Sequence, residues 1–168
     1  MGTTQNLVAS EAVEKMRELV GDSPTCMLAT NIAGVPPHLC PMQVQDVDDE
    51  GCLWFFSGAD SAHNSHVQAD PRVQLIFSNN SKHEYLAVYG TAEITNDIDK
   101  VDELWSSMVK TWFPQGKDDP NLTLIRVCPE KVHYWDVKDG KLVAMAKILL
   151  GAVTGHPQDI GIEGDLKP

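Results

Sequence analysis

The sequence contains no apolar run close to the roughly 20 residues that a membrane-spanning helix needs. Its first residues also lack the basic start, apolar block and small-residue cleavage site of a secretory signal. We therefore expect no membrane partner, and the cytoplasm is the expected compartment. Basic residues are scarce as well, with 13 Lys and Arg against 24 Asp and Glu and a net charge of −11. Because this charge repels phosphate backbones, we expect no nucleic-acid partner.

Cysteine is sparse and unpaired in the sequence. The four cysteines, Cys26, Cys40, Cys52 and Cys128, are widely spaced and form no CxxC motif. This spacing argues against a zinc cluster and against a redox dithiol, and it favours reduced, buried thiols. A chain of 168 residues has the size of one domain, and it buries enough surface to fold without a metal or a disulfide.

The order of sequence patterns predicts a mainly β fold in a single domain, residues 1–168. A helix is expected at about 10–21, with Ser10 as its cap. Short β-rich runs follow over about 25–137, and they predict six or seven antiparallel strands in a small closed barrel with peripheral helices. A C-terminal helix beginning near 140 and a mobile tail reaching 168 complete the expectation.

Local signals add detail to this order. Pro41 cannot donate to a strand ladder, so its strand should have an edge position or a bulge there. Asp60 or Ser61 can cap a short helix that Pro71 ends. A later helix is expected to carry four apolar side chains on one face and to run into a Pro- and Gly-containing loop. Those four are Ile98, Val101, Trp105 and Met108.

Several segments occur in the order seen in a known family. They are HLCPMQV, GCLWFFSGADSAHNSH, ADPRVQL, YLAVYGTAEI, LWSSMVKTWFPQGKDDPNLTLIRVCPEKVHYWD and GKLVAMAKILLGAVTG. The chain resembles the FMN-binding split barrels of the pyridoxamine 5'-phosphate oxidase-like superfamily, in its general stress protein branch, from Ser10 to about Gly164. The resemblance implies a six-stranded antiparallel Greek-key split β-barrel, a homodimer, and FMN (or the larger FAD) in clefts between subunits.

Side chains suited to a flavin gather in two of these segments. An apolar slot suits the ring system, and a helix N-terminus suits the phosphate. The resemblance implies cofactor contacts from Cys40, Pro41, Met42, Trp54, Phe55, Phe56, Ser57, Asp60, Ser61, His63 and Trp112. Without the resemblance, a plain core is the favoured interpretation of the three consecutive aromatic residues. The aromatic pair Trp112 and Phe113 suits either a cleft cover or a plug beside the barrel.

Two positions depart from the family pattern. The family usually carries Arg directly before the Pro-Met pair and Lys two residues after the capping Ser, where this chain has Cys40 and His63. Both cations would face the phosphate. A protonated His63 can replace one of them, so phosphate affinity is expected to rise at lower pH.

Other histidines allow more than one interpretation. His63 and His66 form an HxxH pair on one helical face, which suits a metal, but no third ligand lies near them in sequence. No metal site is therefore predicted. His38 suits either the ring or an ordinary strand hydrogen bond. His133 and Trp135 are expected in a structural position or at the dimer interface.

Three hypotheses of function remain open from the sequence. The first is a flavin-dependent oxidoreductase, in which FMN performs hydride or electron transfer on a small-molecule substrate. No catalytic acid or base is assigned. The second is a flavin-binding or planar-ligand-binding stress protein without turnover, and the third is a structural dimer that has lost the cofactor.

Overall fold

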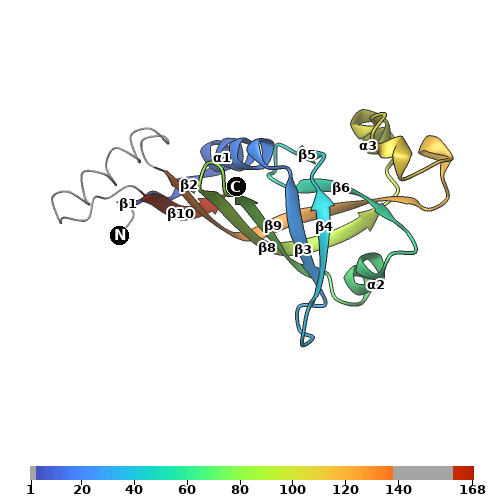
Figure 1. Ribbon diagram of the computed structural model, residues 1–168, viewed down its shortest axis with the longest axis horizontal. Coiled ribbons are helices and arrows are strands. Elements are labelled where there is room, and N and C mark those ends of the chain that lie inside the picture. Colours follow the sequence, from blue (N-terminus) through green and yellow to red (C-terminus); the bar gives the residue numbers. More distant parts are fainter. Residues whose placement is uncertain (1–2, 138–160) are drawn as a thin grey trace.

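The structure of the chain, a computed structural model, describes residues 3–137 and 161–168, and it is built mainly from β-strands (Figure 1). The strands are Thr3–Thr4 (β1), Leu7–Val8 (β2), Thr25–Thr30 (β3), His38–Gln43 (β4), Asp46–Val47 (β5), Leu53–Gly58 (β6), Arg72–Asn79 (β7), Glu84–Thr95 (β8), Leu122–Val137 (β9) and Gly161–Lys167 (β10). The helices are Ala9–Asp22 (α1), Ala62–Ala69 (α2) and Ile98–Leu104 (α3), with 3-10 turns at Val109–Thr111 and Gly116–Asp118. The predicted mainly β class with peripheral helices is confirmed. Within these described ranges, no helix is long and apolar enough to cross a membrane.

Six strands form a continuous antiparallel run in the order β4-β3-β7-β8-β9-β6. Strand β4 ends this run and pairs only with β3 among the described strands, so Pro41 occupies an edge strand as its sequence predicts. The two terminal strands of the run, β4 and β6, are not paired with each other in the described structure. The run is therefore left open between them.

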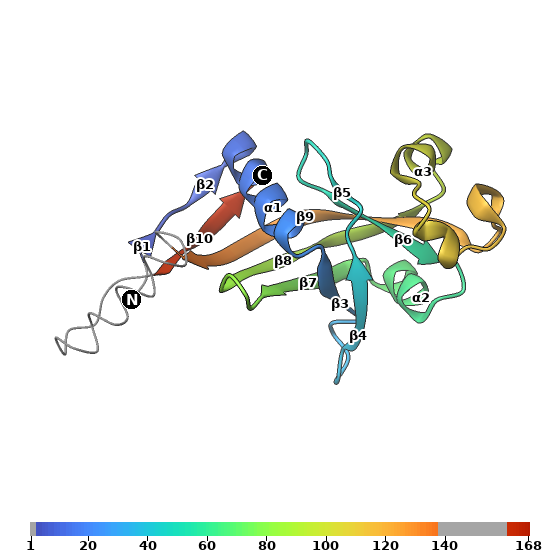
Figure 2. The ribbon, with the colours of Figure 1, turned by 45° about the horizontal axis from the view of Figure 1, so that its top comes forward.

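The sheet is larger than the sequence predicts. β10 pairs antiparallel with β9 and parallel with both β1 and β2, which makes the described sheet ten-stranded and mixed (Figure 2). The expectation of a mobile tail to residue 168 is therefore wrong for 161–167. Its Gly and Asp residues belong to a strand that is held from both sides, and Gly164 lies too close to the carbonyl of Gln5 for any side chain. The predicted helix beginning near 140 lies outside the described residues.

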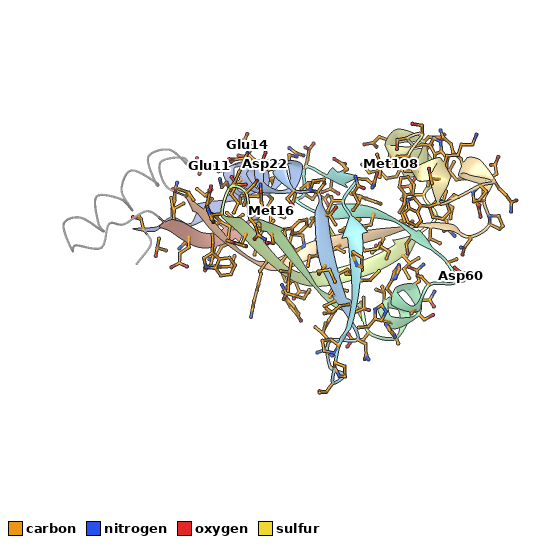
Figure 3. The ribbon with its side chains drawn as sticks, in the orientation of Figure 1. Glu11, Glu14, Met16, Asp22, Asp60 and Met108 are labelled. Carbon is orange, nitrogen blue, oxygen red and sulfur yellow. A yellow bond between two sulfur atoms is a disulfide. The ribbon has the colours of Figure 1, made fainter. Side chains whose placement is uncertain are left out.

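Helix α1 covers the sheet with one apolar face. Met16 is fully buried toward the sheet, while Glu11, Glu14 and Asp22 point outward (Figure 3). The predicted cap at Ser10 is wrong, because the helix begins at Ala9 directly after β2 and its capping position makes no side-chain hydrogen bond. The pairing of β2 with β10 sets this start.

Helix α2 follows its sequence signals closely. Ser61 accepts a hydrogen bond from the Asn64 amide at 3.2 Å, and the helix ends at Ala69, before Pro71. Helix α3 is shorter than predicted. Its last residue is Leu104, because the Trp105 backbone turns to an extended conformation and its ring packs edge-on against Phe56.

Strand β6 has apolar side chains on both of its faces, so the sequence predicts that both faces are covered. Each face packs against a different part of the molecule. Leu53 and Phe55 are fully buried in the main core between the sheet and α1. Trp54 and Phe56 face the other way, into a smaller cluster with Val101 of α3. The helix therefore covers a strand face that would otherwise expose large aromatic rings to water.

The cysteine prediction is wrong at two positions. Cys52 and Cys128 form a disulfide with a Cα–Cα distance of 4.3 Å, while Cys26 and Cys40 are free. The pairing arises because β6 and β9 run antiparallel with Leu53 opposite Val127, which places the residues at either side opposite each other. A separation of 76 residues hides this neighbourhood from sequence reasoning.

Candidate functional site

A cavity of about 610 Å³ lies where the antiparallel run is open, between β4 and β6. The start of α2 and the segment after α3 close its remaining sides. Its lining residues are Thr25, Cys40, Pro41, Met42, Gln43, Gln45, Phe56, Ser57, Gly58, His63, Ser106, Met108, Val109, Trp112 and Phe113. This volume lies within the range of small-molecule sites, roughly 300 to 1,000 Å³. Among the residues that the structure describes, the lining contains no Lys, Arg, Asp or Glu.

Seven of the eleven residues that the family resemblance implies line this cavity. They are Cys40, Pro41, Met42, Phe56, Ser57, His63 and Trp112. Strand alternation directs Cys40 and Met42 to the same side of β4, and both are half-buried. Burial raises the pKa of the Cys40 thiol, so this residue is a neutral wall of the cavity near pH 7.

The other four residues lie away from the lining. Phe55 is fully buried in the main core, and Trp54 packs in the smaller cluster beside α3. Asp60 and Ser61 form the turn before α2, where the Asp60 amide donates to the Asn121 side chain and Ser61 caps the helix. Figure 3 shows Asp60 at this turn near α2, whereas Met108 lies near α3.

The α2 end of the cavity is polar and tightly bonded. His63 Nε2 lies 2.7 Å from Ser57 Oγ, and the Ser57 hydroxyl donates to Asn64 Oδ1 at 2.6 Å. The Asn64 amide donates to Thr123 Oγ1 at 3.0 Å, and the Thr123 hydroxyl donates to the Ser57 carbonyl at 2.9 Å. Three of these side chains, those of Ser57, Asn64 and Thr123, are buried. The network therefore holds His63 in one position.

Two further histidines stand beside His63. Thr30 Oγ1 lies 3.0 Å from His66 Nδ1 and 3.3 Å from His38 Nδ1, and the rings of His38 and His66 are 5.0 Å apart. Burial lowers the pKa of His63 below its usual value, and His38 and His66 lower it further. The three imidazoles therefore favour a neutral His63 near pH 7. His133, by contrast, bonds to Asp165 of β10 at 2.8 Å and packs against Trp135.

The segment after α3 supplies the other wall. Phe113 is buried and packs near Phe56, with ring centroids 6.4 Å apart. Trp112 is 79% exposed although it borders the cavity, and Met108 is 64% exposed. The two aromatic residues thus differ: Phe113 fills space beside β6, whereas most of the Trp112 ring remains accessible.

Sequence reasoning missed several polar residues of the site. Gln43 and Gln45 line the cavity next to the predicted Met42, and Asn64 and Thr123 support His63 from behind. The position of Asn64 in the first turn of a capped helix was the one available signal, because side chains there lie near the helix N-terminus. Nothing near Thr123 in the sequence indicates a partner on β6 or α2.

Comparison with known proteins decides the family. The family model described as "Pyridoxamine 5'-phosphate oxidase like" matches residues 11–159. The chain belongs to this pyridoxamine 5'-phosphate oxidase-like family. Within the family it is similar to general stress protein 26 of Bacillus subtilis, with 33% identity over 82 residues, which are 47% of this chain and 58% of that protein. The chain spans little more than half the length of the curated relatives it matches.

The chain shares its fold with solved structures of general stress proteins. A protein from Jannaschia sp. CCS1 of the general stress protein 26 type has a TM-score of 0.79 and 24% identity, covering 94% of this chain and 99% of that one. The general stress FMN/FAD binding protein of Xanthomonas citri has a TM-score of 0.64 and 30% identity, covering 74% and 87% respectively. The arrangement of strands described above is therefore that of the pyridoxamine 5'-phosphate oxidase-like fold.

Proposed function

We propose that this chain is an FMN-binding flavoprotein of the general stress type that works as a cytoplasmic homodimer and a flavin-dependent oxidoreductase. One observation carries the proposal: the residues that the family resemblance implies converge from β4, β6, α2 and the segment after α3 on a single cavity. The Xanthomonas citri relative that binds FMN or FAD has the same fold. The six antiparallel strands then correspond to a Greek-key split barrel, with the cavity at its split.

The cavity residues fit the two parts of FMN differently. Met42, Phe56 and Trp112 offer apolar surface for the ring system, and Gln43 and Gln45 offer amide groups for its polar edge. The phosphate fits best at the start of α2, where free backbone amides favour an anion and His63 lies beside them. FAD remains the larger alternative for the same slot.

When bound, FMN supplies hydride or electron transfer. The chain's own residues contribute binding, orientation and exclusion of water. The apolar walls exclude water from the ring, and the network behind His63 fixes one polar group at the α2 end. Trp112 closes the open side of the slot. No residue of the lining is assigned as a catalytic acid or base.

An exposed apolar stripe supports the homodimer. On the face of the sheet opposite the core, Met27 stands opposite Ile76 across β3 and β7, and Tyr85 stands opposite Trp135 across β8 and β9. All four side chains are at least 38% exposed, as is Leu39 on the edge strand β4. A second copy of the chain that covers this stripe removes the exposed apolar surface from water. Light scattering that returns a monomer at micromolar concentration contradicts the dimer.

The proposal is tested on the purified chain itself. We expect a yellow preparation that releases FMN on denaturation and is bleached by a reductant. A colourless protein that cannot be reconstituted with FMN or FAD contradicts the proposal and favours a structural dimer.

A second function is a flavin-binding stress protein without turnover. The absence of Lys and Arg from the described cavity lining favours it, because charge-assisted hydrogen bonds to phosphate contribute about 1.5 to 3 kcal/mol each. Rapid-mixing absorbance separates the two functions. Reduction by a nicotinamide donor followed by reoxidation with an electron acceptor over many cycles supports the oxidoreductase, whereas a bound flavin that completes no cycle supports the binder.

A further inference from the structure

The hydrogen bonds at the α2 end of the cavity have a fixed direction. The Ser57 hydroxyl has a single proton, and it donates that proton to Asn64 Oδ1. The bond between Ser57 Oγ and His63 Nε2 therefore has the imidazole N–H as its donor. A neutral His63 that carries its proton on Nε2 has a lone pair on Nδ1. Within the described residues, Nδ1 of His63 makes no hydrogen bond, so it is the nitrogen that is open to a proton.

The surroundings of His63 keep this nitrogen unprotonated when no anion is near. His66 follows one turn later on α2, and the ring of His38 on β4 lies 5.0 Å from the ring of His66. The pKa of His63 is lowered by burial and by these two imidazoles, and no carboxylate contributes to the shift. The free N-terminal amides of α2 add partial positive charge at the same place.

The other titratable groups around this site are few. Cys40 of β4 shares the cavity lining and has a raised pKa, so it carries no charge near pH 7. Asp60 lies in the turn before α2 and is exposed. Asp119, in the loop before β9, accepts hydrogen bonds from the Gln115 and Asn121 amides. No described Lys or Arg lines the cavity, so His63 is the residue of the lining that can become a cation.

We propose that the α2 end of the cavity is a proton-gated phosphate site, in which His63 takes up a proton on Nδ1 as a phosphate monoester binds at the helix N-terminus. This inference rests on the proposed flavin function and deepens it, because it assigns the phosphate of FMN to a site that is neutral when empty. Binding of the anion and uptake of the proton stabilise each other, since the imidazolium and the helix amides both favour negative charge. The expected consequence is that phosphorylated ligands are retained more strongly as pH falls, while unphosphorylated ones are not.

The test compares FMN with riboflavin, which lacks the phosphate, by titration of the purified chain at several pH values from 8 to 6. We expect the ratio of FMN affinity to riboflavin affinity to rise about tenfold over this range. The pH is kept at 6 or above because the phosphate itself takes up a proton near pH 6. Salt is kept moderate and constant because screening weakens the contribution of charge.

Matched variants assign the effect to His63. His63→Gln keeps a donor for Ser57 but takes up no proton, so it should abolish the rise of the FMN-to-riboflavin affinity ratio at low pH. His63→Lys provides a permanent cation, so the affinity ratio should be high and should not change with pH. Cys40→Arg should raise the affinity ratio at every pH. His66→Gln, one turn along the same helix and outside the lining, should keep the rise and move it to higher pH. Circular dichroism confirms that each variant is folded.

A second measurement is independent of the flavin ring. The imidazole signals of the protein are followed by NMR against pH, with inorganic phosphate, FMN or riboflavin present. We expect phosphate and FMN to raise the pKa of His63 and riboflavin to leave it unchanged. An effect of inorganic phosphate alone, with no effect of FMN, assigns the site to another phosphate ester.

The outcomes separate this inference from the proposed function. If both flavins bind and the ratio of their affinities does not change with pH, the inference of a proton-gated site is wrong and the flavin function stands. If neither flavin binds at any pH, the flavin function is wrong, and the response of His63 to inorganic phosphate alone decides the anion site. A pKa of His63 that is unchanged by phosphate and by FMN overturns the inference.

Discussion

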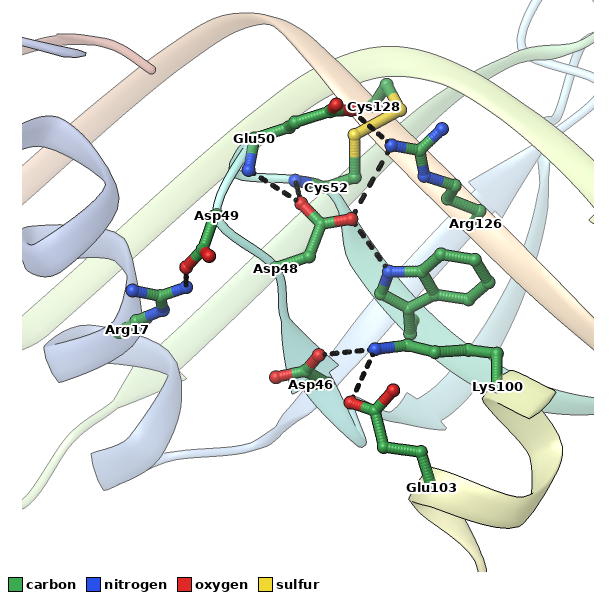
Figure 4. A network of polar contacts seen from close by, with 11 residues as sticks. Arg17, Asp46, Asp48, Asp49, Glu50, Cys52, Lys100, Glu103, Arg126 and Cys128 are labelled. Atoms are coloured by element: carbon green, nitrogen blue, oxygen red, sulfur yellow. Dashed lines mark hydrogen bonds and ion pairs between the residues drawn. A yellow bond between two sulfur atoms is a disulfide. The ribbon is translucent and has the colours of Figure 1, made fainter. Parts of the chain in front are cut away.

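The two ends of strand β6 are built from similar residues but have opposite surroundings. At the first end, Trp54 donates to Asp48 at 2.9 Å, and Lys100 and Arg126 stand over its ring (Figure 4). At the other end, Phe56 and Ser57 border the cavity. The aromatic residue of the first end thus has its ring faces and its N–H covered by protein groups, whereas Phe56 leaves part of its surface to a ligand.

The two ends of β6 differ in how many of their polar groups already have hydrogen-bond partners. Asp48 accepts hydrogen bonds from two backbone amides as well as from Trp54, and Arg126 pairs with Asp48 and Glu50. Most donors and acceptors of this network are in use, so it stabilises a position and offers little to a ligand. Among the described residues, the Nε of Arg126 is its one buried donor without a hydrogen-bond partner. The His63 end retains an imidazole nitrogen without a described partner and an empty volume beside it. We infer that the first end is structural and the second is functional.

The largest expected effect distinguishes the aromatic residues next to each other on β6. Phe55→Ala removes a fully buried ring from the main core and should cost about 3 to 5 kcal/mol of stability. Phe56→Ala removes a half-buried ring at the cavity, so it should cost clearly less stability and weaken flavin binding more. Urea unfolding and flavin titration of both variants measure this. Equal losses of stability would show that Phe56 belongs to the core as much as Phe55 does.

Much of the cavity was accessible to sequence reasoning because its signals are local. The capping Ser61, the terminating Pro71 and the edge residue Pro41 each act through neighbouring backbone, and each lies where its pattern predicts. The family resemblance implies contacts from Cys40 to Met42 and from Phe56, Ser57 and His63, and these residues meet at the open space between β4 and β6.

The features that sequence reasoning missed depend on contacts between distant segments. The Cys52–Cys128 bond needs the register of β6 against β9, and strand β10 needs the edges of β9 and the N-terminal strands. Likewise, Trp105 leaves the helical pattern because its ring meets Phe56 on another element. None of these partners can be identified from local composition.

The second prediction breaks the structural end of β6. Cys52→Ser removes the disulfide, which closes a loop across a separation of 76 residues, and should cost about 2 to 4 kcal/mol of stability. FMN affinity should change little, since neither cysteine lines the cavity. Cys40→Ser is the matched control at a free cysteine of the lining, and its melting temperature should stay near that of the parent. A Cys52→Ser protein that melts with the parent would show that the bond contributes nothing to stability.

The third prediction addresses the functional side. Trp112→Ala should weaken flavin binding about tenfold while changing stability by less than about 0.5 kcal/mol, because most of this ring is exposed. Phe113→Ala is the contrasting variant, since Phe113 is buried and should lose stability instead. If Trp112→Ala leaves flavin affinity unchanged and lowers the melting temperature, the ring serves as a plug beside the barrel.

The smallest expected effect is a pH dependence of stability without any ligand. The folded protein lowers the pKa of His63, so the unfolded chain binds more protons at this position than the folded one. The stabilising contribution of neutral His63 is therefore fully present above the unfolded pKa, near 6.5, and it is lost as pH falls through that value toward the lower folded pKa.

Thermal melting of the ligand-free protein should thus show a decrease in melting temperature between pH 7 and pH 5 that His63→Gln reduces. His83→Asn, at an exposed histidine of the turn between β7 and β8, should leave the decrease intact. Added phosphate should oppose the decrease in the parent and not in His63→Gln, because only an imidazole that takes up a proton gains from the anion. A decrease of the same size in parent and His63→Gln would place the responsible proton elsewhere.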